Sequence, residues 1–231
     1  MFADDIEAHS TQVPGVTTPV SGGEVASVLH RVGSVGQPQR LLLSASPNSL
    51  PADSLAQAVI TATIVDAQGH TISTDNRTLV SFSALSGSAL IDGPLAAQAQ
   101  SGRAETSLRA NTNTDTVRIR AIASGLLPDT IAVALVPSPT AQIDLSAIPQ
   151  SILLEAGDSS DLIAILRDAY GNPTLSSERV QFSLTGPGIF VDGLSSITAT
   201  EGRATTHVRA TTPGTLHVTV AVNSIQADID I

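Results

Sequence analysis

The chain has 231 residues without a single cysteine or lysine, and its 21 acidic residues against 11 arginines give a net charge of −10. This composition excludes disulfides, thiolate metal sites, a Schiff-base lysine and a lysine-dependent phosphate loop, and the acidity disfavours nucleic acid and anionic membrane surfaces. Hydrophobic residues make up 42% of the chain but aromatic residues only 2%, which is typical of sheets with aliphatic cores. No apolar run is long enough to span a membrane, so we expect no membrane insertion.

Residues 1–39 are rich in Ser, Thr, Pro and Gly and predict an N-terminal arm or linker. Within this arm, residues 24–32 are compatible with a short helix or with the last strand of a preceding repeat. The first residues lack the basic-then-apolar layout of a signal peptide, so we expect any targeting signal to lie outside this sequence.

From Arg40 onward the pattern changes to short apolar segments separated by turn residues, which is typical of a β-sandwich. We predict strands at 40–46, 56–65, 78–83, 103–110, 116–123 and 130–136. The second of these strands ends in the turn Asp66-Ala67-Gln68-Gly69-His70. Pro137-Ser138-Pro139 then interrupts the strand pattern and predicts a short, stiff connector.

After this connector the pattern repeats. The turn at Asp66 returns at Asp168-Ala169-Tyr170-Gly171-Asn172-Pro173, at an offset of 102, and three further matches follow at an offset of 100: Val80-Ser81-Phe82 with Val180-Gln181-Phe182, Asp92-Gly93 with Asp192-Gly193, and Gly102-Arg103-Ala104 with Gly202-Arg203-Ala204. A small insertion in the first copy, before Val80, explains the change of offset. The repeat predicts an all-β chain with two tandem immunoglobulin-like Greek-key β-sandwiches, at residues 40–137 and 138–231.

Alternation along the strands also predicts which side chains fill the two cores. For the first sandwich we expect Ile64, Phe82, Ile119 and Val133 on the inner faces. For the second we expect Ile165, Phe182, Val208 and Val218.

Residues 40–231 resemble the bacterial immunoglobulin-like domains of the invasin and intimin type. The resemblance depends on the segment Ala164-Ile165-Leu166-Arg167-Asp168-Ala169-Tyr170-Gly171-Asn172-Pro173, the Val180-Gln181-Phe182 strand, and Thr200-Glu201-Gly202-Arg203-Ala204. The first copy keeps the order but has His70 where that family usually has Asn. The resemblance implies a repeated module of a bacterial surface or secreted protein.

No catalytic motif stands out, so we expect a protein that is not an enzyme. Among the five histidines, only His207 and His217 fall on consecutive strands, and two histidines without a third ligand make a poor zinc site. Arg118 and Arg120 lie on one face of a strand, after the strand that holds Arg103, Glu105 and Arg109. For these arginines we expect solvated cross-strand pairs rather than an anion-binding face.

One metal site is predicted at the junction of the sandwiches. The turn that begins at Asp168 in the second sandwich should face the loop of residues 111–115 in the first. This arrangement would bring Asp115, Asp168 and Asn172 together. Oxygen ligands of this kind suit calcium. The competing hypothesis is that these side chains only cap their own turns.

We therefore predict a non-catalytic structural and adhesion module, located extracellularly or on the bacterial cell surface, that acts as a stalk or interaction segment. Its expected partners are neighbouring immunoglobulin-like repeats or subunits and a host or cell-surface protein. Two alternatives stay open. In the first alternative, the chain is a filament subunit whose N-terminal arm adds a strand to a neighbouring subunit. In the second, it is an accessory module of a secreted polysaccharide-degrading enzyme.

Overall fold

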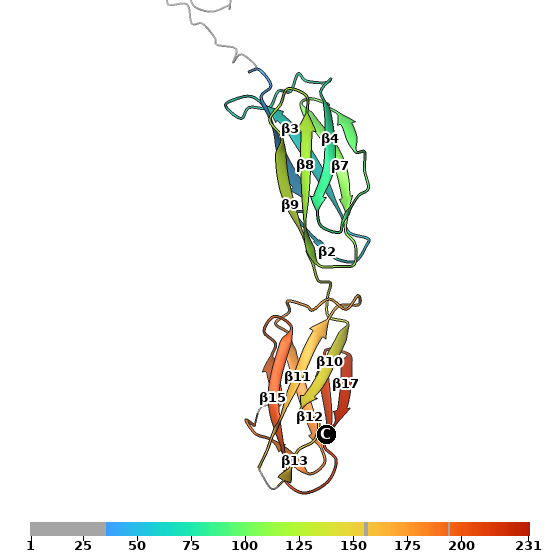
Figure 1. Ribbon diagram of the computed structural model, residues 1–231, viewed down its shortest axis with the longest axis vertical. Helices are drawn as coiled ribbons and strands as arrows, with labels where there is room; N and C mark the ends of the chain where they lie inside the picture. The colour runs from blue at the N-terminus through green and yellow to red at the C-terminus, as the bar shows by residue number, and fades with distance from the viewer. Residues whose placement is uncertain (1–35, 155–156, 194) are drawn as a thin grey trace, which may run out of the picture. The chain divides into compact units, whose positions relative to one another are not determined.

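The computed structural model describes residues 36–154, 157–193 and 195–231, and the elements that build its architecture are all β-strands (Figure 1). Residues 1–35 of the predicted N-terminal arm lie outside the described residues. The strands form four sheets, two in each of two sandwiches. In the described part of the chain, no helix is long and apolar enough to cross a membrane.

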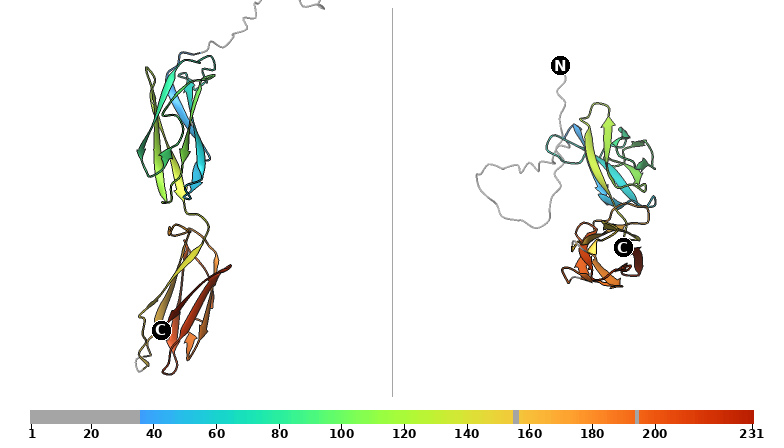
Figure 2. Two further views of the ribbon diagram at one scale, coloured as in Figure 1. Left: turned by 90° about the vertical axis from the view of Figure 1, so that its right-hand side faces the viewer. Right: turned by 60° about the horizontal axis from the view of Figure 1, so that its bottom comes forward.

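The first sandwich has nine strands: β1 (Arg40–Ser46), β2 (Ser49–Pro51), β3 (Gln57–Val65), β4 (Leu79–Ser86), β5 (Leu90–Ile91), β6 (Ala96–Gln98), β7 (Arg103–Arg109), β8 (Asp115–Ala123) and β9 (Asp129–Val136). One sheet has the order β1-β3-β7-β5 and the other β2-β9-β8-β4-β6. Neighbouring strands are antiparallel, except that β2 pairs with β9 in parallel. Figure 2 shows the two sheets of this sandwich from two further directions.

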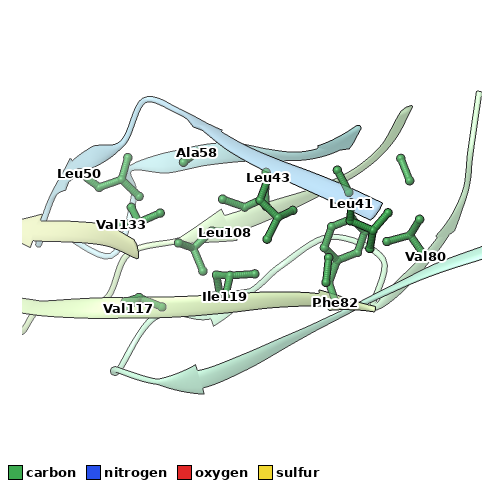
Figure 3. Packing of buried hydrophobic residues seen from close by; sticks show 14 of the residues in the cluster. Leu41, Leu43, Leu50, Ala58, Val80, Phe82, Leu108, Val117, Ile119 and Val133 are labelled. Atoms are coloured by element: carbon green, nitrogen blue, oxygen red, sulfur yellow. The ribbon is translucent and has the colours of Figure 1, made fainter. Parts of the chain in front are cut away.

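An aliphatic core fills the space between these two sheets (Figure 3). Strand alternation produces it directly: along β8, Val117, Ile119 and Ala121 point inward while the intervening residues are exposed. The four residues predicted for this core are all buried: Ile64, Phe82, Ile119 and Val133.

The second sandwich has eight strands: β10 (Gln142–Ile148), β11 (Ser160–Arg167), β12 (Arg179–Thr185), β13 (Gly188–Phe190), β14 (Ser196–Thr198), β15 (Arg203–Ala210), β16 (His217–Val222) and β17 (Ile225–Asp230). Its sheets have the orders β10-β11-β15-β13 and β14-β12-β16-β17. It encloses a core of its own around Phe182, which is 1% exposed.

The core prediction was wrong at one position of the second sandwich. Phe182, Val208 and Val218 are buried, but Ile165 is only half-buried and points to the outer face of β11. The inward residues of this strand are Leu162, Ala164 and Leu166. Because β11 has isoleucine on its outer face and leucine or alanine on its inner face, apolarity alone does not distinguish the two faces.

The structure also locates the insertion in the first copy. Ile72 and Thr174 are equivalent at an offset of 102, since their backbone N–H groups bond to the equivalent carbonyls of Ile64 and Leu166. Thr78 and Glu178 are equivalent at an offset of 100, since their carbonyls accept from Ala99 and Ala199. The two extra residues therefore lie between Ile72 and Thr78.

Candidate functional site: the aspartate-centred turns

The turn after β3 is organised around the buried carboxylate of Asp66. Its Oδ1 accepts the backbone N–H groups of Gln68 (3.0 Å) and His70 (2.8 Å), and its Oδ2 lies 3.3 Å from His70 Nδ1. The backbone closes the turn, because Asp66 N donates to the His70 carbonyl and Gly69 N to the Asp66 carbonyl. Gly69 has a φ of +89°, a conformation that other residues adopt only with strain.

The turn after β11 repeats this arrangement with Asn172 in place of the histidine. Asp168 is fully buried, and its Oδ1 accepts the N–H groups of Tyr170 and Asn172, both at 2.9 Å. Its Oδ2 accepts the Asn172 side-chain amide at 2.8 Å and the N–H of Ser138 at 3.1 Å. The Asp168 carboxylate thus accepts four hydrogen bonds. Three of them come from within the sequence Asp-Ala-Tyr-Gly-Asn and stabilise its turn conformation.

The donors keep both carboxylates ionised. Burial alone would raise the pKa of Asp168, but the hydrogen bonds from Asn172, Ser138 and Tyr170 outweigh it, so the pKa lies below its ordinary value of 3.8. Asp66 behaves in the same way: burial raises its pKa, while hydrogen bonds from His70 and Gln68 lower it below the ordinary value.

Sequence reasoning missed the chain segment that leads into each sandwich. Ser138, in the connector, donates to Asp168 from immediately before the second sandwich. Gly36 is its equivalent at the offset of 102, and a methyl group added there would lie 2.4 Å from Asp66 Oδ2. In both copies, the segment that enters the sandwich therefore passes directly over the turn carboxylate. The same offset pairs Gly36 with Ser138 in the sequence, but it does not show that either residue contacts an aspartate.

The three residues predicted to bind calcium make the following contacts. Asp168 uses both oxygens as described above, and Asp115 Oδ1 accepts the N–H of Thr116 at 2.6 Å. Asn172 Nδ2 donates to the carbonyl of Thr112 at 2.8 Å. Nowhere in the described ranges do three or more His, Cys, Asp or Glu side chains form a group that could hold a metal ion. The calcium site stays a prediction.

His207 and His217 do not share a site, because β15 and β16 belong to different sheets. Each histidine instead lies between two aspartates. His207 Nδ1 is 2.8 Å from Asp192 and its Nε2 is 3.3 Å from Asp161. His217 Nδ1 is 2.7 Å from Asp230 Oδ1 and its Nε2 is 3.7 Å from Asp228 Oδ1.

The hydrogen bond that His217 Nδ1 donates to Asp230 is the main reason why the pKa of His217 lies above its ordinary value of 6.5. Burial lowers that pKa, but the negative charges of Asp230 and Asp228 add to the increase. His217 is therefore more readily protonated in the folded chain than in the unfolded one.

The two sandwiches and their paired turns define the chain as a tandem of immunoglobulin-like domains. Comparison with known proteins makes this more specific: the family described as invasin, domain 3, matches residues 139–230. The chain is 30% identical over 154 residues to the inverse autotransporter adhesin YeeJ of Escherichia coli, an alignment that covers 66% of this chain and 6% of that protein.

Among solved structures, InvD of Yersinia pseudotuberculosis matches with a TM-score of 0.59 and 21% identity, over 82% of this chain and 56% of that one. The chain thus spans a small part of YeeJ and about half of the InvD structure. Residues 139–230 match this family, and the chain has the fold of the bacterial immunoglobulin-like domains of the invasin and intimin type, which are found in bacterial surface and extracellular proteins. The resemblance inferred from the turn motifs is confirmed.

Proposed function

We propose that the chain is a non-catalytic spacer of a bacterial surface adhesin, in which the domains 40–137 and 138–231 hold a binding tip away from the envelope. The observation that carries this proposal is that each sandwich has its own core and that the segment leading into each sandwich lies against the same carboxylate turn. Because each sandwich has its own core, further copies can be added to the chain without altering the packing of the neighbouring sandwiches. The relative YeeJ, which bears the name adhesin, supports the class of protein.

The strand pairing suits a spacer that carries load. In the first sandwich the terminal strands β1 and β9 pair with β3 and β8 through seven residues each. In the second, β10 pairs with β11 through seven and β17 with β16 through six. A pull along these strands shears the ladders, so their hydrogen bonds resist together instead of opening one after another.

The spacer role can be tested on the bacterial surface with an epitope tag at the binding tip. Removing residues 36–231 should reduce the access of an antibody to the tag, because the tip then lies closer to the envelope. Inserting two unrelated sandwiches of the same length should restore access. If the unrelated pair fails to restore it, or if removal has no effect, the chain does not act as a spacer.

We also keep the calcium site of Asp115, Asp168 and Asn172 as a proposal. A bound ion would tie the turn after β11 to the loop before β8 more strongly than the hydrogen bond between Asn172 and Thr112 does alone. An unchanged melting temperature in millimolar calcium and in chelator would remove the idea.

A further inference from the structure

The outer face of the sheet β2-β9-β8-β4-β6 carries two neighbouring arginines. Arg118 and Arg120 are exposed on β8, which lies between β9 and β4 (Figure 1). Their cross-strand neighbours are small: Ser83 and Thr130 flank Arg120, and Ala132 flanks Arg118. We call these five residues the arginine face.

Within the described residues, neither guanidinium forms an ion pair or a hydrogen bond. The expectation of cross-strand pairs holds for Arg109, which lies 3.5 Å from Asp92, but it is wrong for these two. Glu105, which was expected among them, lies on β7 in the opposite sheet and accepts a hydrogen bond from Thr61.

The acids at the ends of β8 and β9 are engaged elsewhere. Asp115 accepts the N–H of Thr116, and Asp129 accepts those of Leu43 on β1 and of Thr130. The outward positions of β4, β8 and β9 hold only neutral residues besides the two arginines. A chain with a net charge of −10 thus has one sheet face whose only charges are positive.

In the second sandwich, the equivalent sheet face has acidic partners for its basic residue. By sheet register, His217 and Thr219 are the equivalents of Arg118 and Arg120. Their partners on β17 are Asp230 and Asp228, where β9 has Ala132 and Thr130. The second sandwich therefore supplies two carboxylates to its basic residue, whereas the first supplies none to its two arginines.

We propose that the arginine face binds an acidic polysaccharide that carries carboxylate or sulfate groups along its chain. Arginines two residues apart on one strand face are separated by about 7 Å, and each guanidinium can hold an anion through two parallel hydrogen bonds. The small flanking residues leave both guanidinium groups accessible, and the hydroxyls of Ser83 and Thr130 can form hydrogen bonds with sugar hydroxyls.

Other ligands fit this face less well. A neutral sugar would need an aromatic ring to stack on, and a protein partner would usually combine arginines with Trp or Tyr anchors, but the face has no aromatic side chain. Nucleic acid requires a larger cluster of positive charge than two arginines in an acidic chain. The proposal is independent of the spacer role, because a spacer needs no ligand of its own.

The test is an NMR titration of the whole chain with three probes: a heparin hexasaccharide, a galacturonic acid hexamer and neutral maltohexaose. We expect one or both acidic probes to shift the signals of Arg118, Arg120, Ser83 and Thr130, and maltohexaose to shift none. Binding should weaken at high salt, because exposed charges are screened. The variant R118Q/R120Q should bind at least about tenfold more weakly.

The matched control is R103Q/R209Q, which makes the same change of charge at two exposed arginines on β7 and β15. It should bind like the wild type. The proposal is overturned if neither acidic probe shifts the face, or if both double variants lose affinity equally, since the attraction would then be non-specific. It is also overturned if a poly-glutamate peptide binds the face and the acidic sugars do not. Because all four arginines are exposed, we expect both variants to fold.

Discussion

Replacing Asp168 by alanine should strongly destabilise the second sandwich. The change removes the acceptor for four donors: the N–H groups of Ser138, Tyr170 and Asn172 and the side-chain amide of Asn172. A buried donor left without a partner costs roughly 1–3 kcal/mol, but water can reach some of these groups once the carboxylate is gone. We therefore expect the free energy of unfolding to fall by about 2–4 kcal/mol.

The chain offers a selective probe of this change. Tyr170 is the only tyrosine and there is no tryptophan, so tyrosine fluorescence reports on the turn that is altered. Urea unfolding followed by this signal should show a lower midpoint with an unchanged slope. In thermal unfolding, a domain of this size should lose roughly 10–30 °C.

The control is Asp144→Ala, which removes an aspartate that pairs with Arg167 at the surface. Exposed pairs of this kind contribute less than about 1 kcal/mol. If Asp168→Ala shifts the midpoint no more than Asp144→Ala does, the carboxylate does not hold the turn together and our reasoning about it fails.

Three further predictions concern backbone strain, protonation and metal. Gly202 has a φ of +74°, and a methyl group there would lie 2.2 Å from the Thr174 carbonyl oxygen. Gly202→Ala should therefore lower the free energy of unfolding, measured in urea, by more than about 2 kcal/mol. Gly171 has a φ of +86° but open space around it, so Gly171→Ala should lower it by only about 1 kcal/mol. Because the pKa of His217 is raised on folding, its stabilising effect is full below pH 6.5 and is lost as the pH rises through the folded pKa. Wild-type stability should therefore fall as the pH rises above 6.5, and His217→Gln should flatten this fall. Millimolar calcium should raise the melting temperature if the junction binds it, and a chelator should reverse the increase.

The fold was predictable because the repeat and the strand alternation agree. The turns at Asp66 and Asp168 fix both the offset and the strand ends, and Phe82 and Phe182 mark equivalent core positions. Ile165 was not predictable, because its strand is apolar on both faces and only the sheet packing decides which side is buried.

The arginine face could not be predicted from the sequence for a different reason. Arg109, Arg118 and Arg120 follow one another closely along the chain, but β7 and β8 belong to opposite sheets. Whether an arginine has an acidic partner depends on the register of non-adjacent strands, which short-range sequence patterns do not determine. The roles of Gly36 and Ser138 were hidden similarly, because each contacts an aspartate 30 residues further along the chain.

Stretching the chain between two handles in single-molecule force spectroscopy tests the central claim most directly, that two self-contained sandwiches form a load-bearing spacer. We predict two separate unfolding events, each lengthening the chain by about 300 Å, since roughly a hundred residues extend to about 330–360 Å, less the distance that already separates the ends of the folded sandwich. Both sandwiches should refold when the force is released. A single event of twice that length would show one shared core, and extension without discrete events would show that neither sandwich bears load; either result would contradict the account.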